Sequence, residues 1–253
     1  MEKKSFGQAG DQIVVEEFLE GQEVSILAFC DGQTLLLMDS AQDHKAAFDG
    51  DKGPNTGGMG AYSPAPIFSE IMRKKVRDKI MLPIIRAMQQ EERVYKGILY
   101  AGLMLTKSGP QILEFNARFG DPETQPLLVR MNSDIIPIFE ACIDGTLDQC
   151  QLEWKKESSV CVVMAAEGYP GSYKKGQPIS GLKDANALPG IVVFHAGTKE
   201  KNGEVLTHGG RVLGVTAIGA DTHTAINRAY KAVNEIKWQG VQFRKDIGSK
   251  AYP

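Results

Sequence analysis

The chain has 253 residues, of which 42% are hydrophobic and 24% charged, and a formal net charge of -2. This composition is typical of a globular protein with one or two domains. The balance of 29 basic and 31 acidic residues provides no nucleic-acid-binding surface, so we expect small-molecule partners.

No apolar run reaches membrane-spanning length, and the first residues lack a signal-peptide core. The four cysteines have no metal-site spacing, which indicates reduced thiols in a cytoplasmic protein.

The first predicted element is a β-branched strand over residues 12–18, with no strand before it to pair with. Residues 23–29 and 34–38 predict a hairpin around Asp31-Gly32. Residues 41–66 have no periodicity and predict a long loop, which at this length is mostly functional or disordered. Apolar positions every four residues then predict an amphipathic helix over 69–90 with a bend at Pro83.

Strands are expected over residues 97–106 and 110–116, joined by a turn, and a helix should begin at Asn132 or Ser133 and end at Gly145. A polar segment at 149–158 indicates a boundary between two domains, 1–153 and 154–253. In the second domain, the sequence predicts strands at 159–166, 191–195 and 211–218 and a helix over 222–236, as in a small α/β unit.

Residues 111–123 contain the pattern with the clearest chemistry. Glu114 and Asn116 are two positions apart in a predicted strand, so their side chains should share one face. A carboxylate and an amide oxygen suit Mg²⁺, with phosphate oxygens and water completing its octahedron. Arg118 has the same parity and could bind a phosphoryl group or a substrate carboxylate. The alternative is an ordinary surface salt bridge at a sheet edge.

A glycine-rich segment lies inside the predicted loop, at residues 53–64. Gly57, Gly58 and Gly60 would free the backbone and let its N–H groups approach an anion. The pattern is neither a Walker A loop nor a dinucleotide fingerprint, and Asp49-Gly50-Asp51 lacks calcium-loop spacing. A plain surface turn is the alternative.

Taken in order, the motifs resemble the phosphoribosylamine–glycine ligase family, ATP-grasp enzymes of purine biosynthesis. The resemblance covers nearly the whole chain and is based on residues 15–21, 42–45, 53–66, 113–123 and 209–213. It implies an α/β (α+β) fold: an ATP-grasp carboxy-terminal subdomain with a mainly antiparallel sheet and helices, then a small α/β carboxy-terminal domain.

The same resemblance implies ATP-dependent ligation of glycine to 5-phosphoribosylamine. ATP would convert the glycine carboxylate to an acyl phosphate, which the amine then attacks, and the protein would mainly align the reactants and neutralise charge.

The resemblance also implies residue roles. The backbone of Glu16, Glu17, Phe18 and Leu19 would meet the adenine edge of ATP, and Glu23 would bind the ribose hydroxyls. Glu114 and Asn116 would hold Mg²⁺, or Mn²⁺, on the phosphates. The implied catalytic residues are His44, Lys45, Arg118 and Asp121, and the implied substrate-binding residues are Asp43, Asn55, Thr56, Gly57, Gly58, Met59 and Gly60. Without the family context, Glu23 is an exposed strand carboxylate, His44-Lys45 a solvated turn and Asp121-Pro122 a simple turn.

Two departures from the family pattern stand out. Residues 98–106 contain no Asp or Glu, although many ATP-grasp enzymes have another metal ligand there. The family's amino-terminal substrate domain and the lysines that hold the α- and β-phosphates have no counterpart. We therefore expect that the chain does not run the reaction alone. The sequence leaves open whether the amino-terminal half is a separate chain, a fused segment or a part lost by truncation.

Two other functions stay open: another ATP-grasp carboxylate–amine ligase or carboxylase, and a non-catalytic piece with a structural or binding role. A metal pair of His195 and His208 is disfavoured because no third ligand recurs nearby.

Overall fold

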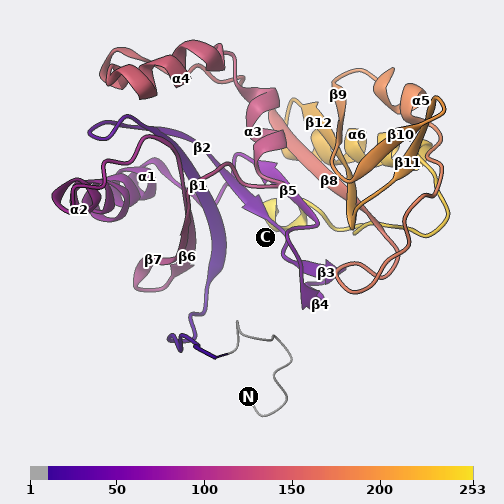
Figure 1. The fold of residues 1–253 in the computed structure, drawn as a ribbon, viewed down its shortest axis with the longest axis horizontal. Helices are drawn as coiled ribbons and strands as arrows, with labels where there is room; N and C mark the ends of the chain where they lie inside the picture. The colour runs from indigo at the N-terminus through magenta and orange to yellow at the C-terminus, as the bar shows by residue number, and fades with distance from the viewer. Residues whose placement is uncertain (1–10, 253) are drawn as a thin grey trace.

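The computed structural model describes residues 11–252, and within them one antiparallel sheet of nine strands organises the molecule (Figure 1). The strand order is β7-β6-β1-β2-β5-β8-β12-β9, and β13 pairs with β8. These strands are β1 (Gln22–Cys30), β2 (Leu35–Asp43), β5 (Gly60–Ser63), β6 (Gly97–Thr106), β7 (Gly109–Asn116), β8 (Ser158–Ala166), β9 (Ile191–His195), β12 (Arg211–Gly219) and β13 (Val241–Gln242).

Two small hairpins lie outside this sheet: β3 (Ala46–Phe48) with β4 (Lys52–Asn55), and β10 (Thr198–Lys201) with β11 (Glu204–Thr207). The helices are α1 (Glu70–Val76), α2 (Leu82–Gln90), α3 (Thr124–Arg130), α4 (Ile135–Asp144), α5 (Leu182–Asn186) and α6 (Thr222–Glu235). Shorter turns are η2 (Arg77–Met81), η3 (Leu147–Gln149) and η4 (Ser249–Ala251). No described helix has the length and apolarity needed to cross a membrane.

The predicted hairpin of β1 and β2 is confirmed, and Asp31 closes its turn. The Asp31 Oδ1 atom accepts hydrogen bonds from the backbone N–H groups of Gln33 (2.9 Å) and Thr34 (2.6 Å). Gly32 has φ +101°, a conformation that favours glycine. The turn is therefore specified by local sequence.

The two faces of β1 and β6 have different partners because side chains alternate along a strand. Val24 and Ile26 face the side covered by α1 and α2, with the buried Val76 and Ile85 in the same apolar cluster (Figure 1). On the opposite face, Leu27 belongs to a second cluster with residues of α4. That helix covers only one end of the face, which leaves the other end free for polar side chains.

The carboxy-terminal half packs α6 against β8 and β12. Its buried positions are small or β-branched, Ala225, Ala229, Ala232 and Val233, so the helix can lie close to the sheet. The Asp221 side chain caps its first turn by accepting from the Thr224 N–H (2.7 Å). The helix predicted over residues 222–236 is confirmed.

The sheet continues across the predicted domain boundary. Strand β5 pairs with β2 on one side and with β8 on the other, with Gly60 opposite Val162 and Tyr62 opposite Val160. Backbone hydrogen bonds therefore join the two predicted domains, and the boundary at residues 153 and 154 stays a prediction.

Two predictions about the first 66 residues are wrong. Residues 12–18 form no strand: Val15 is 85% and Phe18 86% exposed. β-branched residues favour a strand only where a neighbouring strand takes up their backbone hydrogen bonds, and no described strand pairs with this segment. The predicted loop at 41–66 contains β3, β4 and β5. Strand β5 pairs with β8, about a hundred residues later, so no local pattern signals it.

The helices differ from prediction in smaller ways. Helix α4 begins after Asp134, which caps it by accepting from the Ile136 N–H (2.9 Å), and not after Asn132 or Ser133. Helix α3 was not predicted. In the helix predicted over 69–90, the π-helical turn η2 lies just before Pro83, whose ring nitrogen cannot donate a hydrogen bond.

Candidate active site

A cavity of about 500 Å³ opens beside the start of β1. Its lining includes Glu23, Asp43, Lys45 and Asn55. A smaller cavity of about 210 Å³ shares Glu23, Lys45 and Asn55 and adds Glu114 of β7. Residues from four separate strands therefore surround one polar hollow, at the end of the sheet face that α4 leaves uncovered.

A β-bulge turns Glu114 and Asn116 toward this face. Ile112 pairs with Leu103, but Glu114 pairs with Gly102, so Leu113 is the extra residue of β7. Opposite residues of an antiparallel pair share a face, which places Glu114 beside Gly102 on the same side as Glu23. Asn116 lies opposite Tyr100 and shares this side. The two predicted metal ligands thus project the same way from an edge strand.

A buried carboxyl group lies beneath the cavity. Glu123 is 2% exposed, and its Oε1 accepts hydrogen bonds from Ser25 Oγ and Tyr100 Oη, both at 2.9 Å. Burial, with the nearby Asp43 carboxylate, raises the pKa of Glu123. This cluster fixes the post-β7 segment to β1 and β6, because each hydroxyl has a partner on another element. Sequence reasoning assigned Glu123 no role, since nothing in the turn before it signals burial.

Lys45 is a charged group of the cavity. Its Nζ lies 2.9 Å from Oδ2 of Asp43, which is buried. Burial disfavours the ammonium, but the carboxylates of Asp43, Glu123 and Glu23, with Asp43 foremost, together outweigh this effect and raise the pKa of Lys45. Lys45 is therefore a fixed positive charge beside Glu23 and Asn55.

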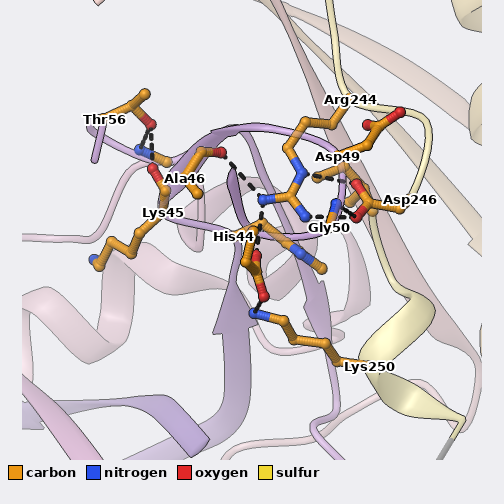
Figure 2. Close-up of polar contacts among 12 residues, drawn as sticks. His44, Lys45, Ala46, Asp49, Gly50, Thr56, Arg244, Asp246 and Lys250 are labelled. Atoms are coloured by element: carbon orange, nitrogen blue, oxygen red, sulfur yellow. Dashed lines mark hydrogen bonds and ion pairs between the residues drawn. The ribbon is translucent and has the colours of Figure 1, made fainter. Parts of the chain in front are cut away.

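The His44 side chain points away from the Lys45 side chain and lines neither cavity. Its side chain is fully buried, and Nε2 accepts from the Gly248 N–H at 3.0 Å. Burial, with the nearby Lys250 and Arg244, lowers the pKa of His44 to about 3, so the ring is neutral. Of the implied catalytic pair His44 and Lys45, Lys45 lines the cavity and His44 does not, so direct contact of His44 with the reactants stays a prediction. The reason for the difference is alternation at the end of β2, which sends neighbouring side chains in different directions (Figure 2).

Three consecutive N–H groups of the glycine-rich segment are bonded within the protein. Gly57 donates to Tyr169 Oη (3.0 Å), Gly58 to Thr56 Oγ1 (2.9 Å), and Met59 to the His44 carbonyl (2.8 Å). These three N–H groups therefore have partners within the protein, and binding of an anion by the glycine-rich segment stays a prediction.

Close packing explains the glycines instead. A Cβ on Gly57 would lie 2.9 Å from Cζ of Arg211, and a Cβ on Gly58, which has φ +112°, would overlap Pro122. Arg211 Nη1 donates to the carbonyls of Gly57 (2.8 Å) and Asp121 (2.6 Å), and Nη2 lies 3.1 Å from Asp121 Oδ2. Arg211, which sequence reasoning did not single out as a site residue, thus joins the glycine-rich segment to Asp121.

Two family models match the chain, and both describe the same enzyme. Residues 1–124 match "Phosphoribosylglycinamide synthetase, ATP-grasp (A) domain", and residues 159–250 match "Phosphoribosylglycinamide synthetase, C domain". The chain belongs to the phosphoribosylglycinamide synthetase family. Glu23, Lys45 and Glu114 fall in the ATP-grasp match and Arg211 in the C-domain match, so both parts of the family sequence build this region.

Known relatives agree with this assignment. A phosphoribosylamine–glycine ligase of Rhodopirellula baltica is 53% identical over 250 residues, covering 98% of this chain and 57% of the relative. The crystal structure of a Thermotoga maritima phosphoribosylamine–glycine ligase has a TM-score of 0.80 at 33% identity, covering 91% of this chain and 56% of that one. The chain thus spans somewhat more than half the length of these relatives.

The ATP-grasp fold itself extends further. The biotin carboxylase domain of a Hydrogenobacter thermophilus 2-oxoglutarate carboxylase has a TM-score of 0.60 at 15% identity, covering 90% of this chain and 48% of that one. At this identity the likeness shows a shared fold only.

Several predicted site residues of the family pattern lie away from the two cavities. Arg118 is exposed and donates to the Phe119 carbonyl (2.8 Å). Met59 is buried, and Thr56 Oγ1 donates to the Lys45 carbonyl (2.8 Å). Glu17, Phe18 and Leu19 border a separate hollow of about 450 Å³, beside the turn between β6 and β7, and Glu16 lies exposed just before them.

The donor set fits one kind of cation. Within residues 11–252, no group of three His, Cys, Asp or Glu side chains is placed to hold a metal ion. Glu114 and Asn116 supply only one carboxylate and one amide oxygen. This suits Mg²⁺, which takes its remaining ligands from phosphate oxygens and water.

Proposed function

We propose that the protein to which this chain corresponds ligates glycine to 5-phosphoribosylamine at the expense of ATP, and that this chain builds the metal-binding side of the nucleotide site. The observation that carries the proposal is the convergence of Glu23, Lys45 and Glu114 on one cavity face. The name of the Rhodopirellula baltica relative supports the reaction. The Hydrogenobacter thermophilus structure is described as a complex with ADP and magnesium, which supports ATP and Mg²⁺ here.

The residues have distinct tasks in this proposal. Glu23 accepts from the ribose hydroxyls of ATP, and Lys45, held charged by Asp43, neutralises phosphoryl charge. Glu114 and Asn116 hold Mg²⁺, or Mn²⁺, which supplies further neutralisation on the phosphate oxygens. The Glu123 cluster keeps this face rigid, so that little reorganisation accompanies the chemistry.

We also propose roles for residues farther from the two cavities. The segment Glu16 to Leu19 serves the adenine edge, and Arg118 and Asp121 serve glycine and phosphoribosylamine together with Asn55 and the glycine-rich segment. His44 acts through the fold, by holding the Gly248 backbone. The chain functions in the cytoplasm as domains 1–153 and 154–253, and it needs the remainder of its longer relatives for catalysis.

Calorimetry with Mg-ATP tests the site. We expect heat from the wild-type chain and about tenfold weaker binding by Glu114→Gln, which removes a charged metal ligand. Glu140→Gln on α4 is the matched control, because Glu140 is exposed and away from both cavities. Equal affinity of all three proteins would contradict the metal role.

A ligation assay tests the reaction itself. A protein of the relatives' full length should form glycinamide ribonucleotide and ADP from glycine, phosphoribosylamine and ATP. Failure with glycine, but ATP turnover with another acid and amine, would reject the proposed substrates. Product formation by the 253-residue chain alone would reject the statement that it needs the remainder.

A further inference from the structure

Lys250 reaches the candidate cavity from the far end of the sequence. It lies in the short turn η4, and it lines the 500 Å³ cavity together with Glu23, Lys45 and Asn55. Its Nζ is 2.7 Å from Asp51 Oδ2, and its side chain is 33% exposed. The C-domain part of the family sequence therefore contributes a second ammonium group to a cavity built mainly by the ATP-grasp part.

A buried arginine fixes the segment that carries Lys250 (Figure 2). The Arg244 side chain is 1% exposed, and its Nε and Nη2 each lie 2.7 Å from a carboxylate oxygen of Asp246. Its Nη1 donates to Asp51 Oδ1 (2.9 Å) and to the Ala46 carbonyl (3.1 Å).

Backbone contacts add to this attachment. The Gly50 N–H donates to Asp246 Oδ2 (2.9 Å), and the Lys245 N–H donates to Asp49 Oδ1 (2.8 Å). The segment from Arg244 to Lys250 is thus held against the β3–β4 hairpin before any ligand arrives. The end of the Lys250 side chain contacts the partly exposed Asp51 carboxylate.

The charges around Lys250 favour an anionic ligand. Burial and Asp43 raise the pKa of Glu23, whereas Lys45 and Lys250 oppose this rise, so both ammonium groups act on the same cavity wall. Asp51, the partner of Lys250, is 46% exposed and also paired with Arg244. A partly exposed ion pair contributes little free energy. Replacing the Asp51 carboxylate by a ligand anion as the partner of Lys250 should therefore require little free energy.

We propose that Lys250 contacts a ligand in this cavity. Its ammonium group exchanges the Asp51 carboxylate for a phosphate group of a substrate. The inference rests on the proposed function, because that function places two phosphate-bearing substrates at the site. Lys250 from η4 and Lys45 from the segment between β2 and β3 would both reach the phosphate, and the Asn55 side chain of β4 lines the same cavity. A nucleotide and a phosphosugar share this chemistry, and separate titrations distinguish them.

The experiment measures the affinity of the 253-residue chain for Mg-ATP and for ribose 5-phosphate by calorimetry. Lys250→Met should raise the dissociation constant about tenfold for the ligand whose phosphate it contacts, the loss expected for a charge-assisted hydrogen bond. Lys250→Arg keeps the charge and should stay within about threefold of the wild type. Lys199→Met is the control, since Lys199 is exposed on β10 and lines neither cavity.

A purely structural role gives a different result. Lys250→Met and Lys250→Arg would then both lower the unfolding temperature, while the affinity for each ligand stayed at the wild-type value, and this would overturn the inference. If Glu114→Gln weakens Mg-ATP binding but Lys250→Met changes neither affinity, the inference fails and the proposed function stands. If the wild-type chain binds neither ligand, the inference also fails, and the ligation assay decides the proposed function separately.

Discussion

Removing the Arg244 guanidinium should destabilise the protein strongly. Arg244→Met keeps most of the side-chain volume but leaves the Asp246 and Asp51 carboxylates without their shared cation and the Ala46 carbonyl without its donor. Breaking a buried pair by removing one partner costs about 3–5 kcal/mol. Asp246 is 26% and Asp51 46% exposed, and Asp51 keeps Lys250, so hydration relieves part of the cost. We expect the lower end, about 3 kcal/mol.

Urea unfolding of Arg244→Met and of a control, Arg228→Met, measures this cost. Arg228 is exposed and donates to the Ile218 carbonyl, so its loss should cost less than about 1 kcal/mol. If Arg244→Met is no more destabilising than Arg228→Met, the reasoning about a buried ionic clamp is refuted.

The pH dependence provides an independent check. Burial opposes ionisation of Asp246, but the Arg244 guanidinium and the Gly50 N–H together outweigh it and lower the pKa of Asp246 to about 2. A carboxyl group with a lowered folded pKa contributes stability above its ordinary pKa, and this contribution is lost as the pH falls through the folded value. The difference in the free energy of unfolding between wild type and Arg244→Met should therefore become smaller as the pH falls from about 4 to about 2. A constant difference would contradict the assignment.

Three further predictions concern packing and burial. Gly58→Ala should lower the free energy of unfolding by about 2–4 kcal/mol, because a Cβ at this positive φ would overlap Pro122. In the control Gly176→Ala, which also has a positive φ but lies in open space, urea unfolding should show a loss of only about 1 kcal/mol. Ser25 Oγ and Tyr100 Oη also lie 2.8 Å apart, so after Glu123→Ala one hydroxyl can donate to the other and one buried hydroxyl loses its acceptor, which should cost about 1–3 kcal/mol. Glu123→Gln keeps an acceptor, and an equal loss would refute that account. Burial raises the pKa of the Cys161 thiol to about 12, so iodoacetamide at pH 8 should modify the partly exposed Cys150 first, as mass spectrometry would show, and early modification of Cys161 would contradict its burial.

Local sequence signals predicted those elements whose determinants lie close together in the chain. The hairpin turn at Asp31-Gly32, the pair β6 and β7, and helix α6 follow from turn chemistry, alternation and capping within a few residues. Strand β5 escaped prediction because it is only four residues long, from Gly60 to Ser63, and most of its pairing is with β8, which is remote in sequence.

The site shows the same division. Strand alternation predicted that Glu114 and Asn116 share a face, although the bulge at Leu113 that aims this face toward Glu23 has no sequence signal. Alternation also separates His44 from Lys45, which the motif had treated as a unit. The contributions of Lys250 and Arg244 depend on contacts about two hundred residues apart, which no motif spacing encodes.

The unbroken sheet limits how access to the site can change. Rotating the C-domain strands against β1 and β6 would break the backbone ladder on one side of β5, at about 1 kcal/mol for each hydrogen bond. The pairing of β5 therefore opposes a rotation of the C-domain strands against β1 and β6. The β3–β4 hairpin lies outside this sheet and, in the described part of the chain, has no such ladder to β1 or β8; side-chain carboxylates of Asp49, Asp51 and Asp246 attach it to the segment around Arg244.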